Sequence, residues 1–204
     1  MIDLQYAKKA FENYLNDYDQ KNEKIKLKIV HTYGVMECSK KITEDMKLSA
    51  EDCELAQIIG LLHDIGRFEQ IRLYHTFNDG KSVNHAEMGI KILFENGMIR
   101  KFIEDKQYDE IIKKAILNHN KARIENNLTE RETLHSKIIR DADKVDIFYS
   151  LTVYSKEAVW ESPDLSNDVI SDEIYREFKE DKRIEYKNRK SAADGLVCHF
   201  AYVY

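Results

Sequence analysis

The sequence predicts an all-α fold in which one domain forms a helical bundle. The chain of 204 residues contains seven glycines and a single proline, too few for the many tight turns of an all-β protein. Apolar residues also recur at three- and four-residue steps in most segments, which is the period of an amphipathic helix. With 43% hydrophobic and 34% charged residues, the composition is that of a globular protein with one sizeable core.

Three helices are expected in the first third of the chain, over residues 2–18, 25–42 and 49–66. The first has Ala7, Phe11 and Leu15 on one side, at four-residue steps. The third begins with a Ser-x-x-Asp capping signal at Ser49. We expect it to end near Gly66, because glycine tolerates the left-handed conformation found at helix termini.

A long loop is expected over residues 73–85, since its sequence, LYHTFNDGKSVNH, has no helical period. Further helices are expected over residues 86–96, 108–119, 129 to beyond 149, 170–178 and 192–204. The chain is expected to break around residues 160–168. We expect residues 149–204 to pack as C-terminal helices on a core whose motifs lie within 27–148, so that residues 1–204 form a single domain.

The totals also bear on partners and location. The net charge of −5 argues against a nucleic-acid polymer as a partner. The three cysteines form no CxxC pair, which argues against a zinc knuckle or a disulfide framework. The N-terminal segment lacks the apolar core of a signal peptide, and no later run could span a bilayer. We therefore expect a reduced, cytoplasmic protein without a membrane partner, and the sequence does not fix its oligomeric state.

Four histidines are expected to face the interior of the domain. His31 and His119 both lie in phase with apolar residues of their own helices, and His63 follows Ile59 by four residues. His85 stands where the long loop meets a helix. A single inward histidine is more often a hydrogen-bonded core residue than a metal ligand, but four in one helical domain are unusual.

His63 is followed directly by Asp64, at the end of an apolar run. A buried carboxylate is costly unless a cation lies beside it, and neutral imidazole with carboxylate is a donor set that divalent first-row metals accept. This pair therefore favours a metal site over a purely structural role. His135 and His199 are expected to be surface or packing residues, and His75 lies in the long loop without an assigned role.

A metal centre of this kind needs a distant carboxylate, and the stretch IIRDADKVDIF offers Asp141, Asp143 and Asp146. Helical phasing places Asp141 on the same stripe as Ile138, and Asp143 on the opposite side with Ile139. Because both sides carry apolar residues, periodicity does not choose between them, although it leans towards Asp141.

Together, His31, the His-Asp pair in LLHDIGR and the aspartate in DADKVD resemble the HD superfamily of metal-dependent phosphohydrolases, in its HDIG type. The resemblance implies an all-α bundle of the HD-domain type with one bound divalent ion. Carried over residue by residue, it implies His31, His63, Asp64 and Asp143 as metal ligands. Asp143 is chosen over Asp141 because the aspartate of the family directly precedes a basic residue.

Two further segments, NHAEMGIKIL and AILNHNK, are similar to segments of the binuclear subgroups of this family. They imply His85 and His119 as ligands of a second ion, with Asp64 bridging the two; the alternative is that both histidines serve packing only. The Gly-Tyr-Pro signature of the cyclic-dinucleotide phosphodiesterases is absent, since the only proline is Pro163.

The resemblance implies hydrolysis of a small phosphorylated substrate, with a nucleotide as the leading candidate, by a metal-activated water. The metal could be Mn, Fe, Mg, Co, Ni or Zn. Asp64 could also receive the proton of the water, while Arg67 and Lys144 are expected to contact phosphate, and Lys121 and Arg123 are weaker candidates. The alternatives are a di-iron oxygenase of the HD type and a metal-bound regulatory or sensing module with little turnover.

Overall fold

A computed structural model describes residues 2–154, 167–180, 184 and 188–201. The described residues form helices, turns and loops without a strand, which confirms the all-α prediction. The chain divides into two compact units, Met1–Ile147 and Phe148–Tyr204. That residues 149–204 pack on the core to form a single domain stays a prediction. No described helix is both long enough and apolar enough to cross a membrane.

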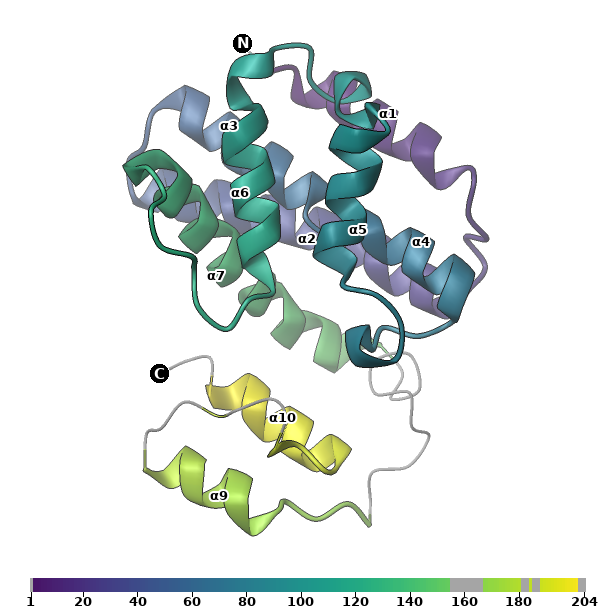
Figure 1. Ribbon diagram of the computed structural model, residues 1–204, viewed down its shortest axis with the longest axis vertical. Coiled ribbons are helices and arrows are strands. Elements are labelled where there is room, and N and C mark those ends of the chain that lie inside the picture. Colours follow the sequence, from purple (N-terminus) through teal and green to yellow (C-terminus); the bar gives the residue numbers. More distant parts are fainter. Residues whose placement is uncertain (1, 155–166, 181–183, 185–187, 202–204) are drawn as a thin grey trace. The chain divides into compact units, whose positions relative to one another are not determined.

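The first unit is built from long helices joined by short helical turns (Figure 1). Its α-helices are α1 (Leu4–Leu15), α2 (Glu23–Asp45), α3 (Ala50–Leu62), α4 (Ile65–Tyr74), α5 (His85–Ile90), α6 (Asp109–His119) and α7 (Glu130–Val153), the last of which continues into the second unit. The short elements are η1 (Asp79–Lys81), the π-helical turn η2 (Lys91–Glu95), η3 (Met98–Lys101) and η4 (Lys106–Tyr108). Helix α2 packs along α3 and contacts α4, while α5 packs against α4 and α6.

The core of this unit consists of aromatic and aliphatic side chains from nearly every helix. Phe11 of α1 packs edge-on against Phe68 of α4, with ring centroids 5.7 Å apart, and Tyr14 contacts the same ring. The hydroxyl of Tyr14 donates to the carbonyl of Ile65, so the buried phenol is paired. These contacts fix α4, and with it the segment that carries Asp64.

The third predicted helix is in fact two helices, so the predicted end near Gly66 is wrong. Helix α3 ends at Leu62, and α4 begins three residues later, with Gly66 inside it. A Cβ atom on Gly66 would lie 2.1 Å from the carbonyl oxygen of His85 and 2.6 Å from the amide nitrogen of Gly89. Glycine is therefore needed here because α4 and α5 approach closely, and not for a left-handed backbone.

The long loop is shorter than predicted because α4 runs to Tyr74. His75 ends that helix in the left-handed conformation, with φ of 57°, and its side chain is exposed. The remaining loop, residues 76–84, contains the turn η1 and leads into α5 at His85.

The start of α3 is joined to α7 through Asp52. Ser49 caps α3 by accepting from the backbone amide of Asp52, as the capping signal predicted. The carboxylate of Asp52 accepts from Arg131 at 2.8 Å and lies 3.1 Å from Nε2 of His135. His135 is 1% exposed, so of the two roles considered for it, packing is correct.

The described part of the second unit contains α9 (Asp172–Lys179) and α10 (Ala192–Phe200). Ser191 and Asp194 form a capping box at the start of α10, and the buried carboxylate of Asp194 also accepts from the amide of Ser171. His199, half-buried, donates from Nδ1 to the carbonyl of Gly195. Most of the predicted break, including Pro163, lies outside the described residues.

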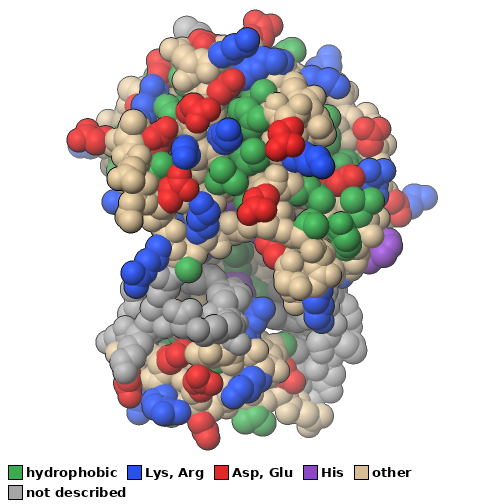
Figure 2. Space-filling model, viewed as in Figure 1, with side chains coloured by type: hydrophobic (Ala, Val, Ile, Leu, Met, Phe, Trp, Pro, Cys, Tyr) green, Lys and Arg blue, Asp and Glu red, His purple; other side chains and the backbone are tan. Residues whose placement is uncertain are grey.

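Acidic and basic side chains are interspersed over the face of the first unit drawn in Figure 2, with hydrophobic side chains among them. This mixture is typical of a solvated surface. The charged groups of most interest are therefore the buried ones.

Candidate metal centre

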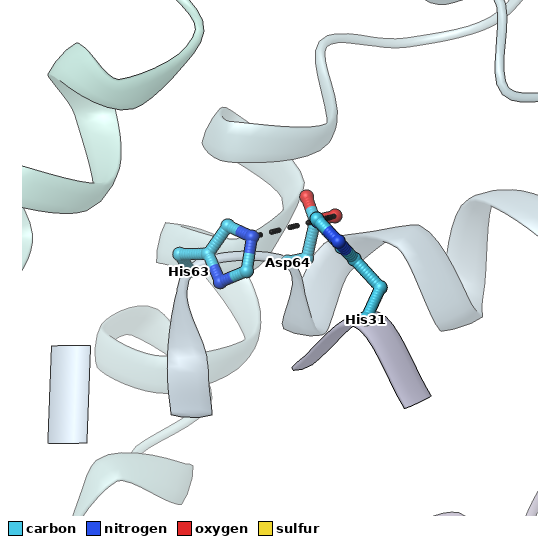
Figure 3. Close-up of side chains that lie close together, drawn as sticks. All are labelled: His31, His63 and Asp64. Carbon is cyan, nitrogen blue, oxygen red and sulfur yellow. Dashed lines mark ion pairs between the residues drawn. The ribbon is translucent and has the colours of Figure 1, made fainter. Parts of the chain in front are cut away.

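Four histidines and one aspartate meet in the interior of the first unit. His31 lies in α2, His63 caps the end of α3, His85 is the first residue of α5 and His119 the last residue of α6. Asp64 lies between α3 and α4. All five side chains are at most 4% exposed. Figure 3 shows how the carboxylate of Asp64 faces the rings of His31 and His63.

The two oxygens of the Asp64 carboxylate face two different pairs of histidines. Oδ2 lies 3.6 Å from Nε2 of His63 and 3.8 Å from Nε2 of His31. Oδ1 lies 3.4 Å from Nε2 of His85 and 3.6 Å from Nε2 of His119. Each pair, together with Asp64, could hold a metal ion. One carboxylate thus joins two potential metal sites.

A second carboxylate reaches the first pair from α7. Oδ1 of Asp143 lies 3.0 Å from Nε2 of His31 and 3.7 Å from Nε2 of His63. Asp141 is exposed, so helical phasing, which leaned towards it, was the poorer guide. That Asp143 binds a metal ion stays a prediction, as does the ligand role of the other site residues.

Two of the histidines donate from Nδ1 to a carbonyl of their own helix. His63 bonds the carbonyl of Gly60 at 2.7 Å, and His119 bonds that of Ile116 at 2.6 Å. Because a carbonyl oxygen can only accept, Nδ1 of each ring carries a hydrogen. In the neutral ring, Nε2 therefore presents a lone pair to the centre.

The other two histidines have carboxylate partners at Nδ1. His31 lies 2.6 Å from Oδ2 of Asp146, and His85 lies 2.6 Å from Oδ2 of Asp79. An ionised carboxylate also accepts only, so Nδ1 of each of these rings carries a hydrogen. Nε2 of His31 additionally lies at hydrogen-bond distance, 3.0 Å, from Oδ1 of Asp143. Nε2 of all four histidines lies within 3.8 Å of a carboxylate oxygen of Asp64.

This donor set fits a divalent metal ion. Nε2 of His85 lies 2.9 Å from Nε2 of His119, so two lone pairs face each other when both rings are neutral. Nε2 of His63 is buried without a hydrogen-bond partner. Such an arrangement of nitrogen lone pairs is unfavourable unless a metal cation or an extra proton lies between the Nε2 atoms. Imidazole nitrogen and carboxylate oxygen are ligands that divalent first-row metals accept.

The electrostatics of the centre agree with this fit. Burial alone would raise the pKa of the Asp64 carboxyl, but Lys28 and His63 outweigh burial and hold that pKa well below its usual range. Burial, followed by the charge of Arg67, lowers the pKa of His85 to about 3, so this ring is neutral at pH 7.

His31 differs from His85 in its preferred charge. Burial and Lys28 lower the pKa of His31, but its hydrogen bonds with Asp143 and Asp146 outweigh them and raise that pKa above its usual value. The two carboxylates thus make His31 easier to protonate than His85.

The cation closest to Asp64 is Lys28, which the sequence reasoning missed. Its Nζ atom lies 2.6 Å from Oδ2 of Asp64, and its side chain is 13% exposed. Lys28 precedes His31 by three residues and therefore shares a face of α2 with it. That spacing was a signal in the sequence that could have identified Lys28.

Arg67 has partners of its own. Its Nη1 atom donates to Oδ1 of Asp79 at 2.8 Å and to the carbonyl of Phe77 at 2.6 Å, while Nε lies 3.7 Å from Oδ1 of Asp64. Asp79, also missed in the sequence reasoning, thus joins Arg67 to His85. The one signal for it was its place six residues before His85 in a polar loop. The role of Arg67 as a phosphate contact stays a prediction.

The remaining predicted cations either have other partners or are exposed. Lys144 donates to the carbonyl of Arg140 at 3.1 Å, and burial lowers the pKa of its ammonium group. Lys121 pairs with Glu125, and Arg123 is exposed. Their contact with a substrate stays a prediction.

Comparison with known families gives one match, to the HD domain, over residues 29–147. Neither the curated proteins nor the solved structures contain a match to this chain. The matched segment covers more than half of the sequence and contains all six residues implied as ligands. The chain therefore belongs to the HD domain family.

Proposed function

We propose that the protein is a metal-dependent phosphohydrolase that acts on a nucleotide or another small phosphate ester. The observation that carries this proposal is the position of Asp64, whose two oxygens face two pairs of histidines. His31, His63 and Asp143 would hold one divalent ion with Asp64, and His85 and His119 would hold a second. Membership of the HD domain family supports the reaction class.

A divalent ion bound here would supply Lewis acidity, which lowers the pKa of water from about 15.7 towards ~7 and offsets phosphoryl charge. The residues of the chain perform the remaining tasks. Asp64 and the four histidines fix the donor atoms in a buried setting, and the carboxylate of Asp64 is held ionised. That Asp64 also receives the proton of the water is part of the proposal.

Three cations lie around the ring of Phe77, and two of them, Lys28 and Arg67, also lie beside Asp64, where they would attract a phosphate group. Nζ of Lys24, Nζ of Lys28 and the guanidinium of Arg67 lie 5.7, 5.4 and 5.8 Å from the centre of the Phe77 ring. Of the three cations, Lys28 is closest to the carboxylate of Asp64. We therefore propose Lys28 as the principal phosphate contact, ahead of Arg67 and Lys144.

The decisive experiment strips the protein with a chelator, reloads it separately with Mn²⁺, Fe²⁺, Mg²⁺, Co²⁺, Ni²⁺ and Zn²⁺, and supplies a panel of nucleotides and phosphate esters. We expect phosphate release that depends on the added ion and disappears in His63→Ala. Oxygen consumption without phosphate release would favour the di-iron oxygenase instead. Metal binding with neither activity would favour a regulatory module. The cytoplasmic location and the small-molecule partner stay predictions.

A further inference from the structure

We propose that Asp79 and Asp146 are positioning residues, each of which fixes one histidine and thereby sets the affinity for a different one of the two ions. The inference rests on the proposed function, because it takes the two-ion centre as given. It goes beyond that function by assigning each half of the centre to a separate supporting carboxylate.

The four histidines fall into two classes according to their Nδ1 partner. His63 and His119 each bond a carbonyl three residues earlier in the chain, so their own helix sets their orientation. His31 and His85 bond carboxylates that belong to other elements. Each half of the centre contains one histidine of each class. In each half, the carboxylate-bonded histidine is therefore the ligand whose orientation depends on a second element of the fold.

Asp146 supports the first half from α7. It is 6% exposed and lies 115 residues from His31 along the chain, with its Oδ2 atom 2.6 Å from Nδ1. The carboxylate fits because α2 has a glycine one turn after the histidine. A Cβ atom on Gly34 would lie 1.8 Å from Oδ1 of Asp146. Because Gly34 has no side chain, the carboxylate of Asp146 has room to bond His31.

Asp79 supports the second half from the loop at residues 76–84. While Oδ2 bonds His85, Oδ1 accepts from Nη1 of Arg67 at 2.8 Å and from Nε2 of Gln70 at 2.9 Å. The side chain of Gln70 is fully buried and also donates to Ser82. The carboxylate is therefore held from the side of α4, and the loop becomes part of the second half.

A carboxylate at Nδ1 fixes the tautomer of a ligating histidine and increases the basicity of its Nε2 atom. Loss of such a partner typically costs about 10–100-fold in metal affinity. Because Asp79 and Asp146 act on different histidines, their losses should be separable.

The test titrates Mn²⁺ into the chelator-stripped full chain by calorimetry and locates the ions by anomalous scattering from manganese-soaked crystals. We expect Asp146→Asn to weaken the ion at His31 and His63 about 10–100-fold and to leave the other unchanged. Asp79→Asn should do the reverse. Gly34→Ala should reproduce the Asp146→Asn result without removing a charge, because its methyl group displaces the carboxylate.

Matched controls separate positioning from the loss of negative charge. Asp141→Asn removes an exposed carboxylate from α7, and Glu87→Gln removes one from α5, and neither should change either affinity. If Asp79→Asn does not fold, as judged by circular dichroism, Asp79→Glu retains the charge and should weaken only the second ion.

Equal weakening of both ions by either Asn variant would overturn the inference, as would a similar effect of the controls. A wild-type protein that binds a single ion would overturn the assignment of two separate halves. A wild-type protein that binds none would instead refute the proposed function, and this is measured before any variant.

Discussion

The ammonium of Lys28 lies 2.6 Å from Oδ2 of Asp64, the oxygen that faces His31 and His63. A metal ion bound by these residues would share that oxygen with the ammonium of Lys28. The positive charges of the ion and the ammonium would then repel each other across one oxygen atom. Under the proposed function, the same ammonium would also attract the phosphate of a substrate. Lys28 is therefore expected to oppose the metal and to favour the substrate.

Replacement of this lysine should separate the two effects. We expect Lys28→Met to tighten metal binding, while kcat/KM for a phosphate ester falls about 10–100-fold, since a hydrogen bond to a charged group contributes roughly 1.5–3 kcal/mol. Calorimetry and steady-state kinetics measure the two effects. Lys26→Met, at an exposed position of the same helix, is the control. Weaker metal binding in Lys28→Met would contradict this interpretation.

Removal of the central pair should abolish both metal binding and hydrolysis. His63→Ala removes a ligand from the first half, and Asp64→Ala removes the carboxylate common to both halves. His63→Ala is expected to lose the ion of the first half, and Asp64→Ala both ions. Each variant is expected to lose metal-dependent turnover while the helical circular dichroism remains. Elemental analysis after dialysis against metal provides the measurement. Full turnover in either variant would show that the site has been wrongly assigned.

The two neighbouring aspartates of α7 should behave differently. Asp143→Ala is expected to lower metal affinity, because its Oδ1 atom faces His31 and His63. Asp141→Ala is expected to change stability by no more than about 0.5 kcal/mol, since its side chain is exposed. Metal titration and urea unfolding of both variants test this pair. If Asp141→Ala lowered metal affinity more than Asp143→Ala, helical phasing would have been the better guide to the ligand.

The link between α3 and α7 should weaken in acid. Burial raises the pKa of Asp52, but its hydrogen bonds with His135, Ser49 and Arg131 outweigh burial and lower that pKa to about 2. A carboxyl whose pKa is depressed on folding contributes stability above its unfolded pKa of ~3.9 and loses that contribution as the pH falls towards the folded value. Wild type should therefore be more stable than Asp52→Asn at pH 5, and the difference should shrink between pH ~4 and ~2. Urea unfolding of both proteins across this pH range measures the difference in stability. A difference that does not change with pH would contradict the low pKa of Asp52.

The close approach of α4 and α5 should not tolerate a side chain. Gly66→Ala would place its methyl group against the backbone of His85 and Gly89, so the helices must separate. We expect a loss of ~1–3 kcal/mol in the free energy of unfolding, the usual cost of overpacking. Gly80→Ala, whose nearest neighbour would be the Asn78 side chain, is the control. Equal stability of the two variants would contradict the packing argument.

The inward histidines could be recognised from the sequence because each has a place in a helical repeat. Phasing failed on α7, where apolar residues occur on more than one side and Val145 is 55% exposed. The choice of Asp143 came from the family motif instead. Helix α4 was missed because Gly66 was interpreted as a helix end, although Ile65, Phe68 and Ile71 recur at three-residue steps.

The supporting residues were harder to predict, because their contacts depend on how separate elements meet. The spacing of Lys28 from His31 places the two on one face of α2, and Asp79 lies six residues before His85, but neither position shows that Lys28 pairs with Asp64 or Asp79 with His85. Asp146 was recognised as one of three candidates, but its bond to His31 depends on the space left by Gly34. Such pairs become visible only when α2, α4 and α7 are placed together.

The contact between His31 and Asp143 joins positions 112 residues apart. A metal ion held by both would close a covalent-like loop that includes most of the first unit, and each end of that loop would restrain the other. Closing a long loop lowers the entropy of the unfolded chain, as a cross-link does. Partial unfolding from either end of the loop would then stop at the bound ion, and the proposed metal centre would be the last contact to open.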